Sequence, residues 1–151
     1  MNLKDLESQG LIEKVKVTER QIWLHLTRAE KDLATAEANL DIDEEWAFTI
    51  AYHAMLRAGR ALMLSEGYRL KGRDQHKTIV VFCAAVLGEQ YKQLVNRFNR
   101  MRVKRHHFIY EPEKPISETE AIGSIQSARE LVEKIKEVLK AESPQKRLFD
   151  D

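Results

Sequence analysis

Proline is absent from the first 111 residues of this 151-residue chain, and the three prolines that follow are Pro112, Pro115 and Pro144. Because proline disrupts the interior of a helix, its absence leaves long helices possible over most of the chain. Apolar residues recur every three or four positions, which is the period of a helix with one buried face. No segment shows the alternation of a half-buried strand. We therefore predict an all-α fold.

The periodic segments are separated by short links that are polar or contain glycine. Two helix starts carry capping boxes, Thr18 with Gln21 and Ser117 with Glu120, and Asp74 is positioned to cap a third helix. Four long helices with short links predict a mostly antiparallel bundle of four to five helices. The expected helices, including a short one near the N-terminus, cover residues 2–8, 18–40, 44–66, 75–87, 89–107 and 118–141.

The length of the chain is typical of one domain, and a domain of this size buries roughly 70 % of the surface of its unfolded chain. We expect residues 1–141 to form this domain and residues 142–151, ESPQKRLFDD, to form a flexible polar tail. Residues 145–149, QKRLF, have the Gln-x-x-Leu-Phe spacing of short clamp-binding peptides. Five residues in a charged tail often match such a pattern by chance, so the spacing carries little weight.

The overall charge is nearly balanced, with 25 basic and 24 acidic residues. Attraction to nucleic acid would therefore have to come from local clusters of charge. The single cysteine, Cys83, excludes an internal disulfide, and no histidines or acids have the spacing of metal ligands, so we expect neither metal nor cofactor. The first ten residues lack the apolar core of a signal peptide, and the longest apolar run is too short to span a bilayer. We expect a cytoplasmic protein that does not associate with membranes.

Positive charge is concentrated in one segment, RMRVKRHHFIYEP, at residues 100–112. The apolar stripe of the preceding helix contains Leu94, Phe98 and Met101. Steps of four from Phe98 and Met101 reach Arg102 and Arg105, so two arginines continue a stripe that faces the core. A purely solvated basic face would instead lie opposite the stripe. Beside these two arginines lie further cations, Arg97, Arg100 and Lys104.

Two interpretations of this segment remain open. In the first, the arginines extend over the rim of the bundle and complement the negative end of the helix dipole. In the second, Arg102 and Arg105 form a phosphate site in a cleft, with His106 and His107 beside them. Arginine suits phosphate because its planar fork donates paired hydrogen bonds. Histidine suits the second interpretation because it transfers protons near neutral pH.

The segment RHHFIY resembles the signature of HEPN domains (higher eukaryotes and prokaryotes nucleotide-binding). That motif is an arginine, usually followed by Asn, Asp or His, with a histidine four to six residues beyond the arginine near the end of a late helix. Arg105 and His106 match its first two positions, whereas Tyr110 occupies the final histidine position. Upstream, residues 51–80 look like the family's helix, glycine-containing loop and H-x-x-V/I helix start. Two other registers keep a histidine and pair Arg102 with His107 or Arg100 with His106.

The resemblance implies an all-helical bundle that forms a homodimer, with the two motifs facing a shared cleft. Many HEPN domains are metal-independent ribonucleases, and some are toxins paired with a small nucleotidyltransferase antitoxin. By this resemblance, Arg102 or Arg105 would hold the scissile phosphate, and His106 or His107 would transfer the proton. Tyr110 would serve as a hydrogen-bond donor. Additional contacts to RNA phosphates would come from Arg97, Arg100 and Lys104.

We therefore keep two hypotheses. The first is an RNA-acting protein, a metal-independent ribonuclease or a relative of such toxins. The second is a non-catalytic module that binds nucleotide or RNA and docks a nucleotidyltransferase partner. The basic segment and its histidines favour the first hypothesis, and tyrosine at the final histidine position favours the second.

Several other polar residues have simpler interpretations. His25 and His53 each lie on a predicted long helix, where a structural role is more common than a catalytic one. His76 matches the upstream family pattern, and we expect it to be structural too. Arg57 and Arg60 are three residues apart, so they either extend the basic cleft or form a solvated face, and we favour the solvated face.

Overall fold

The computed structural model describes residues 1–111 and 116–142. Its elements, in chain order, are α1 (Leu3–Ser8), β1 (Ile12–Lys14), α2 (Glu19–Asn39), α3 (Glu44–Ser65), β2 (Tyr68–Leu70), α4 (Gln75–Leu87), the 3₁₀ turn η1 (Glu89–Tyr91), α5 (Lys92–Tyr110) and α6 (Glu118–Glu142). Helices dominate this part of the chain, which confirms the predicted all-α class.

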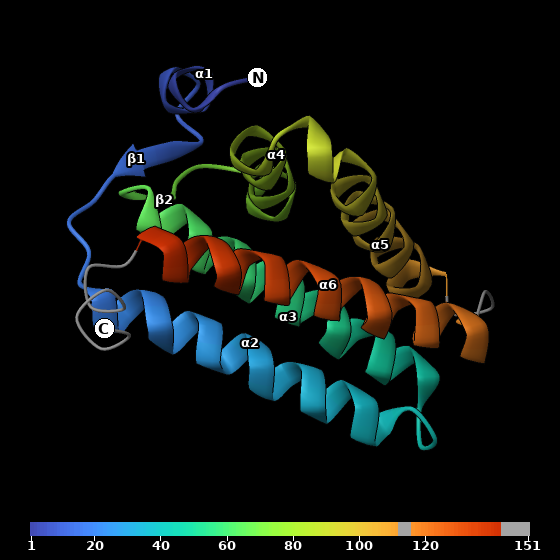
Figure 1. Cartoon of the computed structure of the whole chain (residues 1–151). Coiled ribbons are helices and arrows are strands. Elements are labelled where there is room, and N and C mark those ends of the chain that lie inside the picture. Colours follow the sequence, from blue (N-terminus) through green and yellow to red (C-terminus); the bar gives the residue numbers. More distant parts are fainter. Residues whose placement is uncertain (112–115, 143–151) are drawn as a thin grey trace, which may run out of the picture.

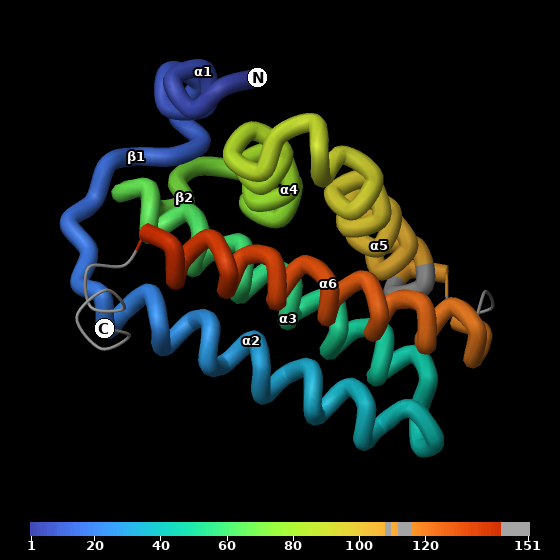
Figure 2. Tube along the Cα trace, in the orientation of Figure 1, coloured from blue at the N-terminus to red at the C-terminus, as the bar shows by residue number. Residues whose placement is uncertain are grey.

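Helix α3 is the centre of the fold. It lies between α2 and α6, and the three helices run side by side across the view (Figure 1). Helices α2 and α3 are antiparallel, whereas α6 runs in the same direction as α3 (Figure 1). Helices α4 and α5 pack on α3 from the opposite side to α2, and α4 crosses α3 at a steep angle (Figure 2).

The composition of α3 explains why four helices can surround it. Its buried positions include five alanines, whose small side chains let neighbouring helices approach closely. At Gly59 the approach of α4 is closest, since a Cβ atom there would collide with the side chain of Ile79. The residues of α3 are therefore small at the point where α4 crosses it. The five alanines are Ala47, Ala51, Ala54, Ala58 and Ala61.

A two-stranded sheet connects the N-terminal segment to the link after α3. Strands β1 and β2 are antiparallel, with Ile12 opposite Leu70 and Lys14 opposite Tyr68. The prediction that no strand is present was wrong for this pair. Each strand has only three residues, which is too short for an alternating pattern to be recognised.

Both predicted capping boxes form, since Gln21 and Glu120 donate their backbone N–H groups to the side chains of Thr18 and Ser117. Asp74 precedes α4 as predicted, but its side chain makes no capping hydrogen bond, because its backbone is left-handed with φ of 54°. Helix α5 ends at Tyr110, three residues beyond the predicted end at His107, so residues 100–110 of the basic segment are helical.

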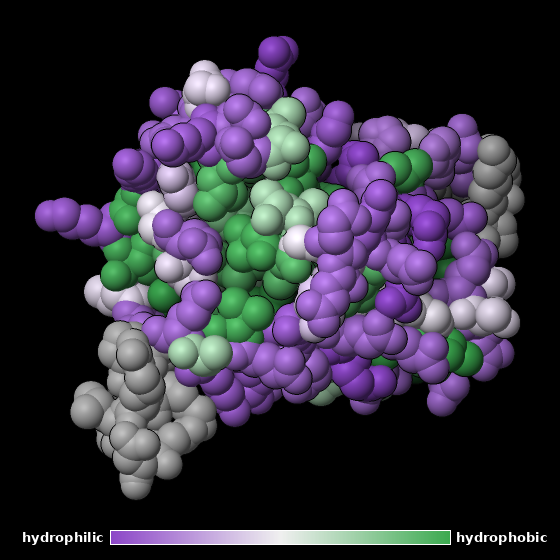
Figure 3. All heavy atoms as spheres, turned by 45° about the horizontal axis from the view of Figure 1, so that its top comes forward, coloured by the Kyte–Doolittle hydropathy of each residue, from purple (hydrophilic) through white to green (hydrophobic). Residues whose placement is uncertain are grey.

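Some apolar surface remains uncovered. The face turned forward in Figure 3 has an apolar patch near its middle, surrounded by polar atoms. Partly buried apolar residues that pack against the core include Val81 and Leu87 of α4 and Val138 of α6. Ile122 is 38 % exposed in the first turns of α6. The helices therefore do not cover the core completely.

Several sequence predictions concern residues outside the described part. The loop that contains Pro112 and Pro115 lies there, as do the tail from residue 143 onward and the clamp-like residues 145–149. Within residues 1–111 and 116–142, each helix is either too short or too polar to cross a bilayer. The same residues contain no group of three or more His, Cys, Asp or Glu side chains arranged to hold a metal ion.

Candidate phosphate-binding site

The basic segment of α5 is divided between two sides of the helix. Arg97 and Lys104 point toward α6, where their partners are Glu130 and Glu120. Arg105 points the other way, with its guanidinium carbon 5.8 Å from the ring centroid of Tyr52 on α3. This division follows from the helical period, because residues three and seven apart share a face whereas neighbours do not.

On the α6 side, carboxylates balance the cations. Arg97 lies 2.7 Å from Glu130, and Lys104 lies 3.4 Å from Glu120. Partial burial raises the pKa of Glu120, but the backbone N–H of Ser117 and the ammonium of Lys104 outweigh it and hold that pKa below its usual value. His107 and Arg100 line a cavity of about 670 Å³ between α5 and α6. On this side, Arg97 and Lys104 are therefore paired with carboxylates, whereas Arg100 has no such partner among the described residues.

On the α3 side, the cations have no such partners. Arg102 donates a hydrogen bond from Nε to the amide oxygen of Asn99, at 3.0 Å. Within the described residues, neither Arg102, Arg105 nor Arg60 forms an ion pair with a carboxylate. The Nε atom of Arg105 is buried, and no acceptor from residues 1–111 or 116–142 reaches it. An excess of positive charge therefore remains on this side.

The arginines surround a polar cluster that three helices bring together. Tyr52 of α3 is fully buried, and its hydroxyl lies 3.1 Å from Nδ1 of His76 in the first turn of α4. The rings of His53 and His76 have centroids 6.4 Å apart. On its other side, the Tyr52 ring packs against Phe98 of α5, at 5.9 Å between centroids. The cluster is therefore part of the packing between α3, α4 and α5.

Burial and nearby arginines determine the charge of this cluster. Burial lowers the pKa of His53 and of His76, and the guanidinium of Arg105 lowers both further. Burial also raises the pKa of Tyr52 to about 12, although Arg105 and Arg102 act in the opposite direction. At neutral pH both imidazoles are neutral and the phenol keeps its proton. The charge of the cluster therefore comes from the arginines alone.

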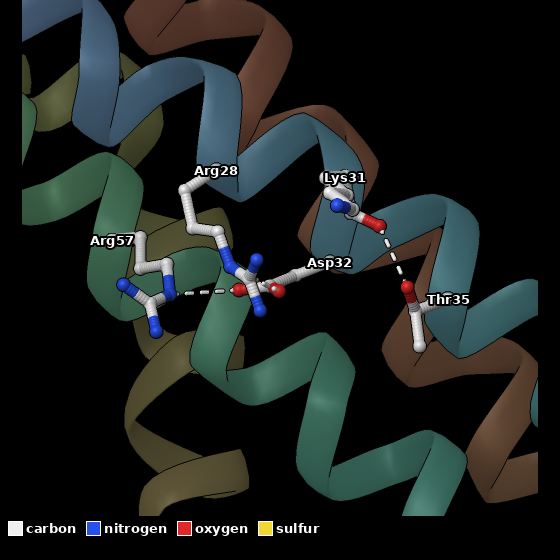
Figure 4. Close-up of polar contacts among 5 residues, drawn as sticks. All are labelled: Arg28, Lys31, Asp32, Thr35 and Arg57. Carbon is white, nitrogen blue, oxygen red and sulfur yellow. Dashed lines mark hydrogen bonds and ion pairs between the residues drawn. The ribbon is translucent and has the colours of Figure 1, made fainter.

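A buried carboxylate lies next to this cluster. Asp32 of α2 is only 7 % exposed, and its oxygens lie 2.8 Å from Nε of Arg57 and 3.3 Å from Nε of Arg28 (Figure 4). Arg57 and Arg105 line one cavity of about 240 Å³. Arg57 is half-buried and paired, so the expectation of a purely solvated face was wrong. Its position extends the basic region instead.

The remaining predicted site residues lie apart from the cluster. His106 and Tyr110 are exposed, and their ring centroids are 4.8 Å apart on the outer side of α5. His107 lies on the α6 side, 4.0 Å from Glu111. The structure thus separates both motif histidines from Arg105, and their catalytic assignment stays a prediction.

Sequence reasoning missed the residues that surround Arg105. Tyr52 was not singled out, and His53 and His76 were interpreted as structural. All three lie within the segment that resembles the HEPN helix, loop and helix start. That shared location was the available signal, but nothing in the sequence showed that these residues meet Arg105.

A comparison with protein-family models matches residues 22–138 to the HEPN domain. A comparison with curated proteins finds no match. The matched region extends from the start of α2 to the end of α6 and includes the arginines and the Tyr52–His76 cluster. Such a domain supports an RNA- or nucleotide-related role in general terms. Because the match covers most of the chain and agrees with the helical fold, the protein belongs to the HEPN domain family.

Proposed function

We propose that this protein acts on RNA and binds its phosphate groups where α3, α4 and α5 meet. One observation carries the proposal. The guanidinium carbon of Arg105 lies 5.8 Å from the ring centroid of Tyr52, whose hydroxyl contacts His76. Within the described residues, neither Arg105 nor the nearby Arg102 and Arg60 forms an ion pair with a carboxylate.

Physical chemistry favours an anion at this position. Half-buried cations interact more strongly than exposed ones because water screens them less. Phosphate oxygens match the paired donors of arginine, and such charge-assisted bonds are stronger than neutral ones. The alternative, in which arginines only extend over the rim, fits Arg105 poorly, because its Nε atom is buried and its guanidinium lies over a buried ring.

In the catalytic form of this proposal, the site cleaves RNA without a metal ion. A neutral imidazole takes the proton of a ribose 2′-hydroxyl, whose oxygen attacks the adjacent phosphorus. The bond to the 5′-oxygen breaks, that oxygen gains a proton, and a 2′,3′-cyclic phosphate remains. Arginines stabilise the charge that develops on the phosphate oxygens. The charge of Arg105 acts on His53 and His76, which lie against Tyr52 under its guanidinium, so they join His106 and His107 as candidates for proton transfer.

The second candidate is a non-catalytic module that holds RNA or nucleotide and docks a nucleotidyltransferase. Tyr110 supports this candidate. It occupies the final histidine position of the motif and is 73 % exposed. Phenols are poor bases near neutral pH, so a tyrosine there suits binding better than proton transfer.

We also propose that the protein forms a homodimer through the outer side of α5. Val103 and Tyr110 lie seven residues apart on this side, and both are exposed. Exposed apolar residues on one face of a helix are typical of a contact between subunits. Light scattering at micromolar protein concentration tests this. A species of only 17.6 kDa would contradict the dimer.

RNA binding is tested by its dependence on salt. Affinity for a single-stranded RNA oligonucleotide should fall steeply between about 50 mM and about 200 mM salt, because phosphate contacts release counterions. Arg102→Ala and Arg105→Ala should each reduce the slope of this dependence by about one. The control is Arg129→Ala, since Arg129 lies on α6 and pairs with Glu37. Wild-type affinity that does not change with salt would contradict the phosphate site.

Cleavage is tested with purified protein in EDTA and RNA labelled at its 5′ end. The expected products carry 2′,3′-cyclic phosphates. Loss of cleavage in His53→Gln or His76→Gln, with binding retained, would support the cluster around Arg105. Loss of cleavage in His106→Gln or His107→Gln would instead support proton transfer by one of the two motif histidines. Binding without cleavage across several RNAs would support the non-catalytic candidate.

A further inference from the structure

The cavity that Arg57 and Arg105 share has a chemically mixed lining. Trp46 and Ile50 of α3 supply apolar surface, and the two arginines supply guanidinium groups. The polar side chains of Asp32, Thr49 and His53 complete the lining. The cavity volume of about 240 Å³ is below the roughly 300–1,000 Å³ of sites for drug-sized ligands. It therefore suits one planar group that lies next to an anion.

Trp46 is exposed yet held on a rigid element. It lies in the first turn of α3, and its backbone N–H donates to the side chain of Asp43, the cap of that helix, at 3.0 Å. The residue is 56 % exposed, so one part of the indole faces solvent beside the cations. A large aromatic surface in this position is suited to stacking, because the backbone that carries it is fixed before a ligand arrives.

Asp32 forms an ion pair with one cation of this cavity. Its Oδ2 lies 2.8 Å from Nε of Arg57, and the two terminal nitrogens of Arg57 point away from the carboxylate (Figure 4). Arg28 approaches the same carboxylate from α2. Because the carboxylate is buried and paired, Arg57 is held in place while its terminal nitrogens can still bind another group.

We propose that this cavity binds a single base of an RNA strand, which stacks on Trp46 while a phosphate of the same strand contacts Arg57. The inference rests on the proposed phosphate site, because Arg105 belongs both to that site and to this cavity. A phosphate bound at Arg105 would therefore lie at the edge of the cavity. The ligand is single-stranded RNA. A base in a duplex is already stacked and paired, so it does not reach a side chain in such a cavity. Stacking on an indole accepts any base, so sequence preference is weak.

Fluorescence tests contact with the indole directly. The chain has two tryptophans, and the other one, Trp23, is half-buried with its indole N–H bonded to Glu19 at 3.1 Å. In a Trp23→Phe variant, Trp46 is the only indole. Single-stranded RNA should quench its emission, whereas inorganic polyphosphate should not, since polyphosphate has no base. Equal quenching by both polymers would overturn the proposal.

Affinity provides the second test. Trp46→Ala should weaken binding of a single-stranded RNA oligonucleotide by about 5- to 100-fold, which is the range for loss of one base–aromatic stack. Trp46→Phe should retain most of the affinity. Polyphosphate binding and duplex RNA binding should not change. The matched control is Leu24→Ala, because Leu24 is also 56 % exposed but lies on α2 outside the cavity.

The outcomes separate this inference from the proposed function. If Arg105→Ala weakens RNA binding and Trp46→Ala does not, the base site is wrong and the phosphate site stands. If Trp46→Ala weakens polyphosphate and RNA equally, the residue acts through structure and the base site is wrong. If the wild type binds neither polymer, both proposals are wrong.

Discussion

On the α6 side of α5, Arg97 and Lys104 lie 2.7 Å and 3.4 Å from glutamates. On the α3 side, Arg102 and Arg105 have no carboxylate partner within the described residues. The two sides belong to one helix and use the same types of residue. They differ because α6 supplies carboxylates, whereas α3 and α4 supply a phenol and neutral imidazoles. A dense run of basic residues therefore does not by itself define a site for anions.

The two sides also differ in burial. The ion pairs on the α6 side are exposed, and such pairs contribute about 0–1 kcal/mol to stability because water and salt screen them. Arg105 lies against a fully buried tyrosine, and its Nε atom is buried. A phosphate at this position would interact through less water, so each contact would contribute more. The following predictions test this contrast.

The largest expected difference is between Arg105→Ala and Arg97→Ala. Loss of a hydrogen bond to a charged group costs about 1.5–3 kcal/mol, so Arg105→Ala should weaken binding of single-stranded RNA by roughly 10- to 100-fold. Arg97→Ala should weaken it by less than about threefold, because a carboxylate already balances that arginine. Fluorescence anisotropy at one fixed salt concentration measures both. Equal losses in the two variants would remove the contrast between the two sides.

The second prediction compares the stability contributed by the buried ion pair next to the cluster, between α2 and α3, with that of an exposed pair on the α6 side of α5. Asp32→Asn removes the charge from a buried carboxylate and leaves Arg28 and Arg57 beside a neutral amide. It should lower the free energy of unfolding by about 1–3 kcal/mol, measured with urea. Glu130→Gln, which breaks the exposed pair with Arg97, should lower it by no more than about 1 kcal/mol. A larger loss in Glu130→Gln would mean that burial does not distinguish the sides.

The third prediction concerns the pH dependence of folding. His53 and His76 have pKa values below their usual value of 6.5 in the folded protein, because of burial and Arg105. The unfolded chain therefore binds more protons as pH falls below about 6.5, and protonation favours unfolding. The free energy of unfolding should be fully retained above that pH and should decrease as pH falls through the folded pKa values.

Urea unfolding at several pH values measures this dependence, and a His53→Gln, His76→Gln double variant serves as the comparison. The double variant should lose less stability than the wild type when pH falls from about 7 to about 5.5. Equal losses would mean that carboxylates such as Asp32 determine the pH dependence.

The smallest change in RNA affinity is expected when a cation on the α6 side loses its carboxylate partner. Glu120→Gln removes the partner of Lys104 and adds one uncompensated positive charge. Because that charge is exposed and screened, RNA affinity should increase by no more than about threefold. A gain of tenfold or more would indicate that any free cation on α5 creates a binding site.

Much of the fold could be predicted, because helices depend on local patterns. The apolar period located the helices, and the capping boxes at Thr18 and Ser117 formed as expected. The pattern could not reveal the short pairing of β1 with β2, because partners such as Ile12 and Leu70 are far apart in the chain. The apolar pattern also did not show that α6 runs parallel to α3, because the direction of a helix relative to its neighbours depends on how the helices pack.

The candidate site was predictable only in part. A step of four from Met101 reaches Arg105, and the structure places the guanidinium of Arg105 over the ring of Tyr52. Which cations are balanced depended on contacts with Glu120 and Glu130, which belong to another helix. A spacing rule on one helix contains no information about such partners.

The sequence by itself determined the helical class and the concentration of arginine and histidine near the end of α5. Both follow from interactions between residues a few positions apart, which any isolated segment already contains. Only the tertiary structure decided that Arg105 lies over Tyr52, that Tyr52 meets His76, and that Asp32 pairs with Arg57 at the cavity that Trp46 also lines. These contacts join four helices, and their geometry exists only when the small residues of α3 allow the helices to approach. The chemistry of the site is therefore a consequence of packing around α3.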